Sequence, residues 1–172
     1  MTHAQTAVPE FVITRRFVAS RQRVWDAWTK PELFATWFGP KGVTTTVLTF
    51  DLRPGGMIHS RMDNHEIGGT IWGKFVPREV TAPERLVWEH SFADADADII
   101  PAPFFDVWPL RLLTTVTFEE AGDGTSVTVT WVPLDATPEQ QQAFASQMSS
   151  MTMGWGGSFD QLDALLADGA DR

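Results

Sequence analysis

The alternation of apolar and polar residues changes its period along the chain. Residues 11–18 are rich in β-branched and aromatic side chains and predict a first strand. Apolar residues at helical spacing then predict two short helices, over 21–29 and 31–38. Ser20 is a suitable cap for the first helix, and Pro31 fits the first position of the second. The chain therefore begins with a strand followed by two short helices.

From residue 43 to residue 132 the pattern has a period of two. Successive residues of a strand point to opposite faces of a sheet, so this period is typical of strands. The turns between the apolar runs are short, which indicates antiparallel neighbours. Together with the strand over residues 11–18, these runs predict an antiparallel sheet of six or seven strands. The strands predicted in this region are 43–53, 57–63, 67–80, 85–92, 110–119 and 125–132.

One long loop interrupts this series, over residues 93–109. It opens with alternating Ala and Asp and continues with Phe104, Phe105 and Trp108 among prolines. Loops longer than about 12–15 residues are usually lids, binding loops or disordered segments. The three aromatic side chains could cover the mouth of a groove.

The last predicted element is a single long helix from residue 138 to about residue 167. Thr137 is a capping residue, and Gln140 three positions later completes a capping box. Three glycines near Trp155 suggest a bend, or a close approach to the strands. Apolar residues recur at steps of three and four and give the helix one apolar face, formed by Phe144, Met148, Met151, Trp155, Phe159, Leu162 and Leu166.

Composition narrows the class of protein. With 172 residues the chain fits a single domain, which we place at 10–168 behind a disordered tail over 1–9. The absence of cysteine excludes a disulfide framework, zinc fingers and thiol catalysis. No run approaches the roughly 20 apolar residues of a membrane-spanning helix, and the N-terminus lacks a secretory signal pattern. We expect a soluble, cytoplasmic protein.

Charge is distributed unevenly around the net value of −9. Residues 1–92 carry eleven basic and nine acidic side chains, whereas residues 93–172 carry two basic and thirteen acidic ones. An acidic half repels phosphate groups, so nucleic acid is not an expected partner. All twenty aromatic residues are Phe or Trp, and side chains of this size either pack a core or line a cavity.

Several short motifs occur in the order and spacing of a known family. They are Arg16-Phe17, Val24-Trp25-Asp26-Ala27-Trp28, Pro31-Glu32-Leu33, Trp37-Phe38-Gly39-Pro40, Asp51-Leu52-Arg53-Pro54-Gly55-Gly56, Gly73, Pro83-Glu84-Arg85-Leu86-Val87, Thr115-Val116-Thr117-Phe118-Glu119-Glu120, Gly124-Thr125, Gly154-Trp155 and Asp160-Gln161-Leu162. In these motifs the sequence resembles the START-like or SRPBCC superfamily. Within it, the sequence resembles bacterial single-domain members of the family of the activator of the heat-shock-protein-90 ATPase.

The resemblance implies an α+β helix-grip fold, in which a curved antiparallel sheet wraps around a long C-terminal helix. Members of the superfamily bind lipids, sterols, polyketides and plant hormones in a cavity between sheet and helix, and some are cyclases or ring-hydroxylase subunits. Three hypotheses follow: binding of a small apolar molecule or lipid, a co-chaperone-like interaction with a chaperone, or a cyclase-like or hydrolase enzyme. We expect no cofactor and a monomer or homodimer.

Two groups of polar residues lie within the predicted strands. His90 shares a face with Trp88, and a histidine there is either a hydrogen-bonded core residue or a contact for a ligand. His59 and Arg61 share one face of strand 57–63, and the pattern does not decide whether that face is inside. If it is, they form an anchor for a carboxylate or phosphate group. The histidines lack metal-site spacing, so no metal is expected.

The predicted ligand-binding residues surround a groove between sheet and C-terminal helix. They are Phe34, Trp37, Phe38, His59, Arg61, Trp72, Trp88, His90, Trp108, Met148, Met151 and Trp155. Methionine adapts to varied apolar ligands, and simple core packing is the alternative role for each apolar residue. The lining is expected to be apolar and its rim acidic, which favours neutral or cationic ligands unless His59 and Arg61 face inward.

Overall fold

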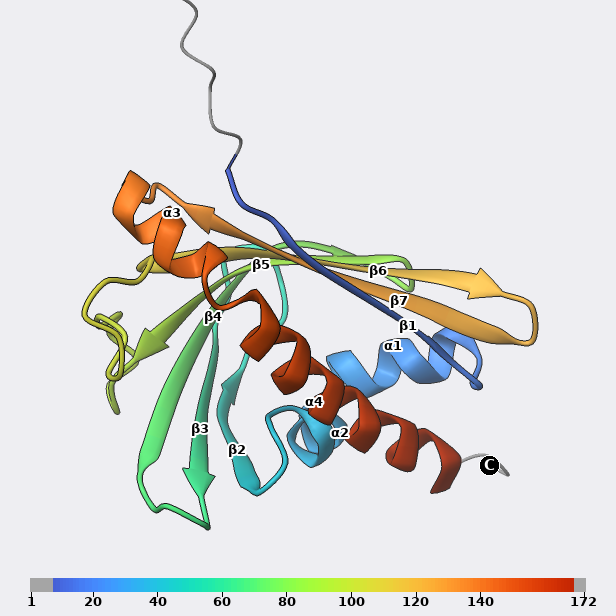
Figure 1. Ribbon diagram of the computed structural model, residues 1–172. Coiled ribbons are helices and arrows are strands. Elements are labelled where there is room, and N and C mark those ends of the chain that lie inside the picture. The colour runs from blue at the N-terminus through green and yellow to red at the C-terminus, as the bar shows by residue number, and fades with distance from the viewer. Residues whose placement is uncertain (1–7, 169–172) are drawn as a thin grey trace, which may run out of the picture.

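The structure is a computed structural model that describes residues 8–168, so most of the predicted tail over residues 1–9 lies outside the described residues. Strands and helices follow one another along the chain in the predicted order (Figure 1). They are β1 (Phe11–Phe17), α1 (Arg21–Thr29), α2 (Pro31–Trp37), β2 (Val43–Phe50), β3 (Ile58–Asn64), β4 (Thr70–Thr81), β5 (Arg85–Ala93), β6 (Arg111–Ala121), β7 (Gly124–Leu134), α3 (Pro138–Ala145) and α4 (Met148–Asp168).

The strands form one antiparallel sheet with the order β1-β7-β6-β5-β4-β3-β2. Consecutive strands from β2 to β7 are neighbours, and β1 pairs with β7, so β1 and β2 are the two edges. The predicted α+β fold with a curved antiparallel sheet is confirmed. Strand ends differ by a few residues: β2 stops at Phe50, and the turn that follows is closed by Gly56 N–H, which donates to Arg53 O at 2.8 Å.

The helix starts follow from local chemistry that the sequence shows. Ser20 Oγ accepts a hydrogen bond from Arg23 N at 3.3 Å at the start of α1. Pro31 is the first residue of α2, where its missing N–H costs nothing. At α3, Thr137 and Gln140 form the predicted capping box, with each side chain bonding to the backbone of the other.

The prediction of one helix over 138–167 is wrong. α3 ends at Ala145, where Gln147 N–H bonds to Phe144 O three residues back and Ser146 Oγ donates to Ala143 O at 2.6 Å. These contacts tighten the last turn. α4 runs through the three glycines without a break, from Met148 to Asp168. Packing of the apolar face of α4 outweighs the roughly 1 kcal/mol of helix stability that each glycine costs relative to alanine.

The helix α4 crosses the concave face of the sheet, and α1 and α2 cover one end of that face (Figure 1). At this end aromatic rings fill the interior. Trp28 lies 4.7 Å from Trp37, 5.9 Å from Phe118 and 6.0 Å from Trp155, measured between ring centroids. The other end is covered by α3 and by residues 94–110, which connect β5 to β6 without further helix or strand. Across residues 8–168, each helix is too short or too polar to cross a membrane.

Candidate functional site

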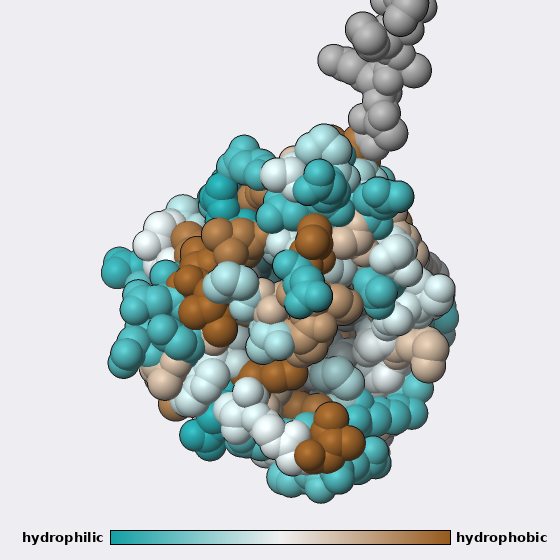
Figure 2. All heavy atoms as spheres, turned by 60° about the vertical axis from the view of Figure 1, so that its left-hand side comes forward, coloured by the Kyte–Doolittle hydropathy of each residue, from teal (hydrophilic) through white to brown (hydrophobic). Residues whose placement is uncertain are grey.

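A cavity of about 320 Å³ lies between α4, the concave face of the sheet and the loop over residues 94–110. Figure 2 looks at this end of the molecule and shows apolar side chains gathered around a hollow in a largely hydrophilic surface. The cavity is lined by Phe38, Gly39, Pro40, Met62, His90, Phe92, Phe104, Phe105, Trp108, Trp131, Gln147, Ser150, Met151, Gly154, Trp155 and Ser158.

The chemistry of this lining is apolar and uncharged. Seven of its residues are Phe or Trp, and two are Met. Among the described residues, no Asp, Glu, Lys or Arg side chain lines the cavity. Such walls can surround a flat apolar molecule, because aromatic rings prefer stacked or edge-to-face contacts with other rings.

His90 is the titratable group of the cavity. Its ring stacks on Phe75 at 4.4 Å and lies 5.9 Å from Trp131. Burial lowers the pKa of His90 to about 4. A smaller pocket of about 70 Å³ adjoins the cavity, and the two share His90, Phe92, Trp108 and Trp131. His90 is therefore neutral at physiological pH and has empty space on two sides.

Five of the predicted site residues line the cavity, namely Phe38, His90, Trp108, Met151 and Trp155. Four others lie in the packed interior. Phe34, Trp37 and Trp88 are almost completely buried, and Trp37 Nε1 donates to Ala27 O at 2.9 Å. Met148 is half-buried and packs against the core.

His59, Arg61 and Trp72 lie on the opposite, convex face of the sheet. Ile58 and Met62 of the same strand face the interior, so His59 and Arg61, at the alternate positions, face outward. His59 stacks on Trp72 at 5.3 Å, and the Arg61 guanidinium lies 5.7 Å from the Trp72 ring. His59 Nε2 is 3.0 Å from Asp94 O. His59 therefore contacts the start of the long loop, and neither His59 nor Arg61 lines the cavity.

Some lining residues were not among the predicted site residues. Met62 and Trp131 extend the buried alternation of their strands, since Met62 follows Ile58, and Trp131 follows Val127 and Val129 at steps of two. This signal was present in the sequence. Gln147, Ser150 and Ser158 carried no such signal, because the break before α4 decides which of its residues face the cavity.

The loop over residues 94–110 forms one wall of the cavity through a row of aromatic contacts. Phe104 lies 5.3 Å from Phe92 and 5.0 Å from Phe105, and Phe105 stacks on Trp108 at 4.5 Å. Trp108 then meets Phe144 of α3 at 5.9 Å. Phe104 itself is 55% exposed, so the row runs from solvent to the buried Phe144 near the end of α3.

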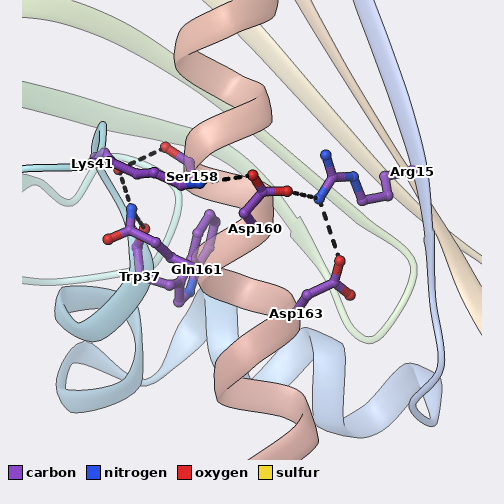
Figure 3. Close-up of polar contacts among 8 residues, drawn as sticks. Arg15, Trp37, Lys41, Ser158, Asp160, Gln161 and Asp163 are labelled. Carbon is purple, nitrogen blue, oxygen red and sulfur yellow. Dashed lines mark hydrogen bonds and ion pairs between the residues drawn. The ribbon is translucent and has the colours of Figure 1, made fainter.

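Polar contacts hold α4 in place beside the cavity (Figure 3). Asp160 accepts from Arg15 Nη1 at 2.7 Å and pairs with Lys41 Nζ at 3.1 Å, so it connects β1 to the segment before β2. Gly39 O accepts from Ser158 Oγ at 2.9 Å and from a second α4 side chain, that of Gln161. Gly39 has φ +118°, and a Cβ on this residue would lie 2.9 Å from Thr45 Oγ1. The residue that supplies this carbonyl must therefore be glycine.

The part of the chain that the structure describes brings no three His, Asp or Glu side chains together where they could hold a metal ion. The aspartates at the start of the long loop make hydrogen bonds within the loop instead. Asp94 Oδ1 accepts hydrogen bonds from the backbone N–H groups of Asp96 and Asp98 at 2.9 and 3.0 Å, which shapes the turn.

The comparison with known families agrees with this geometry. The family model described as "Activator of Hsp90 ATPase homolog 1-like protein" matches residues 18–167. The chain belongs to this family. Its membership and its helix-grip fold place it in the START-like superfamily, as the sequence motifs predicted. No curated protein matches the chain in sequence.

Several solved structures share the fold over almost the whole chain. Protein Ms6760 from Mycobacterium smegmatis is 27% identical, with 92% of this chain and 91% of that chain covered and a TM-score of 0.75. A protein from Arthrobacter aurescens is 25% identical, with coverages of 94% and 87% and a TM-score of 0.77. A protein from Staphylococcus epidermidis is 26% identical, with coverages of 98% and 94% and a TM-score of 0.71.

Proposed function

We propose that this protein binds one small, largely apolar molecule in the cavity between α4 and the sheet. The observation that carries the proposal is an uncharged cavity of about 320 Å³ within an otherwise closely packed interior. Membership of a family with the helix-grip fold supports it. Transfer of apolar surface from water into such a cavity is favourable by roughly 25 cal/mol per Å².

The volume limits the size of the ligand. Small-molecule sites usually enclose about 300–1,000 Å³, so this cavity is at the lower end of the range. It suits a single compact molecule with a few rings, and it is too small for a lipid with two long acyl chains. The aromatic walls favour a planar ligand that can stack against Trp108, Trp131 or Trp155.

Gly154 provides a direct test, because it lines the cavity and a Cβ placed on it has no neighbour within 4 Å. A leucine there would enter the empty space, and leucine favours a helix by roughly 1 kcal/mol over glycine. We expect wild-type protein to bind the neutral fluorescent probe N-phenyl-1-naphthylamine with saturable enhancement of its emission. The Gly154→Leu variant should lose this binding and remain folded.

Gly156 supplies the matched control. It also has no neighbour within 4 Å of its Cβ position, but it does not line the cavity. Gly156→Leu should bind the probe as the wild type does. Absence of saturable probe binding by the wild type, together with no thermal shift from a library of aromatic and aliphatic compounds, would overturn the proposal. Equal loss of binding in both variants would place the probe elsewhere.

The two other hypotheses from the sequence, a chaperone partner and an enzymatic reaction in the same cavity, stay predictions. Each would be tested separately, by stimulation of a chaperone ATPase and by turnover of candidate substrates.

A further inference from the structure

We infer that the cavity selects neutral ligands that carry a hydroxyl or carbonyl group, and that His90 binds this group. The inference rests on the proposed function and adds the chemical class of the ligand. It follows from two observations: the absence of charge in the lining and the free ring of His90.

Charge is the first criterion. The described lining contains no charged side chain that could neutralise an ionised carboxylate, phosphate or ammonium group. Aromatic faces attract an ammonium group, but this attraction is smaller than the cost of removing its charge from water. His59 and Arg61, which could have paired with an anion, lie on the other face of the sheet, where they contact Asp94 O and Asp63. Burying a charge without a partner costs several kcal/mol, so ionised ligands are disfavoured.

The second observation concerns the ring of His90. Within residues 8–168 its side chain makes no hydrogen bond to the protein, and it borders both the cavity and the smaller pocket. Burial lowers the pKa of His90 to about 4, so the imidazole is neutral at pH 7. A neutral imidazole has one N–H donor and one acceptor nitrogen. A hydroxyl can bond to either nitrogen, whereas a carbonyl can accept only from the N–H.

A second polar group lies near His90. Ser60 is 1% exposed, and its Oγ has no hydrogen-bond partner in the described part of the chain. Ser60 Oγ is 3.2 Å and His90 Nε2 is 3.7 Å from the point where a Cβ on Gly73 would lie. Neither Ser60 nor Gly73 lines the cavity, so His90 is the member of this pair that a ligand in the cavity can contact.

The other polar side chains of the lining are less suited to this role. Ser158 Oγ already donates to Gly39 O, and Ser150 is exposed. The indole N–H groups of Trp131 and Trp155 have no partner in the described part of the chain, but they can only donate a hydrogen bond. Gln147, half-buried just before α4, is the competitor that can both donate and accept. It therefore serves as the matched control in the experiment.

The experiment compares ligands that share one ring system and differ in one group. Binding of naphthalene, 2-naphthol, 2-naphthoate and 2-naphthylmethylammonium to the full chain would be measured at pH 7 by calorimetry. Because one net hydrogen bond changes affinity about fivefold, we expect 2-naphthol to bind about fivefold more tightly than naphthalene. Both ionised ligands should bind at least roughly tenfold more weakly than 2-naphthol, since neither has a counter-charge in the cavity.

Variants then assign the preference to one residue. His90→Phe keeps a ring that can stack on Phe75 and should bind naphthalene and 2-naphthol equally. His90→Leu is the second variant if the first does not fold, with urea unfolding as the check. Because Gln147 lines the cavity, Gln147→Leu can change the affinity for both ligands, but the ratio of the 2-naphthol and naphthalene affinities should stay at its wild-type value.

Three results would overturn the inference: equal wild-type affinities for naphthalene and 2-naphthol, tighter binding of either ionised ligand, or loss of the preference in Gln147→Leu instead of the His90 variants. These outcomes are separable from failure of the proposed function. If N-phenyl-1-naphthylamine binds in the cavity and the naphthol preference is absent, only the inference fails. If no neutral probe binds, the proposed function fails as well.

Discussion

At the residue scale, two neighbours on β5 show how the sheet separates charge from the cavity. His90 faces the cavity, and Glu89 faces outward to Arg78 and Arg111, at 2.8 and 2.7 Å. Burial raises the pKa of Glu89, but hydrogen bonds from Arg111 and Arg78 outweigh this and bring it below its usual value. The ion pairs lie outside the sheet, and the neutral imidazole lies inside.

The pKa of His90 predicts how stability depends on pH. In the unfolded chain its pKa is about 6.5, and burial lowers it to about 4 in the folded state. As the pH falls below 6.5 the unfolded state takes up the proton first, so stability decreases until about pH 4 and is unaffected above 6.5. The groups packed against the ring, Phe75 and Trp131, do not titrate, and Glu89 faces away.

The measurement is urea unfolding of wild type and His90→Phe at several pH values between 7.5 and 4. The carboxylates titrate in both proteins, so the difference between the two curves isolates His90. Over this range the wild type should lose at most about 3 kcal/mol relative to the variant. Parallel curves would show that burial does not shift the pKa of His90.

At the scale of elements, α3 links helix capping to the wall of the cavity. The helix has only eight residues, so its ends account for much of its stability. Its one buried residue, Phe144, contacts Trp108 in the cavity wall. Loss of α3 would therefore remove the support of the loop over residues 94–110.

Thr137→Ala removes the cap of α3, whose Oγ1 accepts from Gln140 N at 3.1 Å. We expect the free energy of unfolding to fall by about 1 kcal/mol, as is typical of a lost N-cap. Thr137→Ser keeps the oxygen and should restore most of the loss. Thermal or urea unfolding measures the stability of both variants. If the free energy of unfolding of Thr137→Ala equals that of the wild type, Thr137 does not cap α3.

At the scale of the whole molecule, α4 bridges the two open edges of the curved sheet. Arg15 lies on the edge strand β1, and Lys41 comes just before the other edge strand, β2. Asp160 pairs with both, at 2.7 and 3.1 Å. Hydrogen bonds from Arg15 and Lys41 lower the pKa of Asp160. One carboxylate thus connects the edges of the sheet across the helix.

Asp160→Asn should lower stability at neutral pH, and the difference from the wild type should shrink in high salt because these ion pairs are exposed to solvent. Since the folded-state pKa of Asp160 is lowered, its contribution is present at neutral pH and is lost as the pH falls through that pKa.

Asp163→Asn is the control for this effect. Asp163 contacts Arg15 at 3.3 Å and does not reach the other edge. Its effect in urea unfolding should therefore be smaller than that of Asp160→Asn. Equal effects of the two substitutions would contradict a role in joining both edges.

Much of the fold was predictable because its signals are local. The period of two gave the strands, and the residues at Ser20, Pro31 and Thr137 gave the starts of three helices. Each of these signals depends on hydrogen bonds or side-chain directions within a few residues. The inward direction of the His90 side chain also followed from the alternation of apolar and polar residues along its own strand.

The sequence by itself determined the fold class, the helix starts and the inward position of His90. The tertiary structure decided the break before α4, the outward position of His59 and Arg61, and the cavity beneath Trp108. These features depend on contacts between residues far apart in the chain. An alternating strand has two faces that the sequence can distinguish, but only the neighbouring strands and helices decide which face is inside. Empty space is likewise a property of the whole packing, because it is what the side chains of several elements leave unfilled.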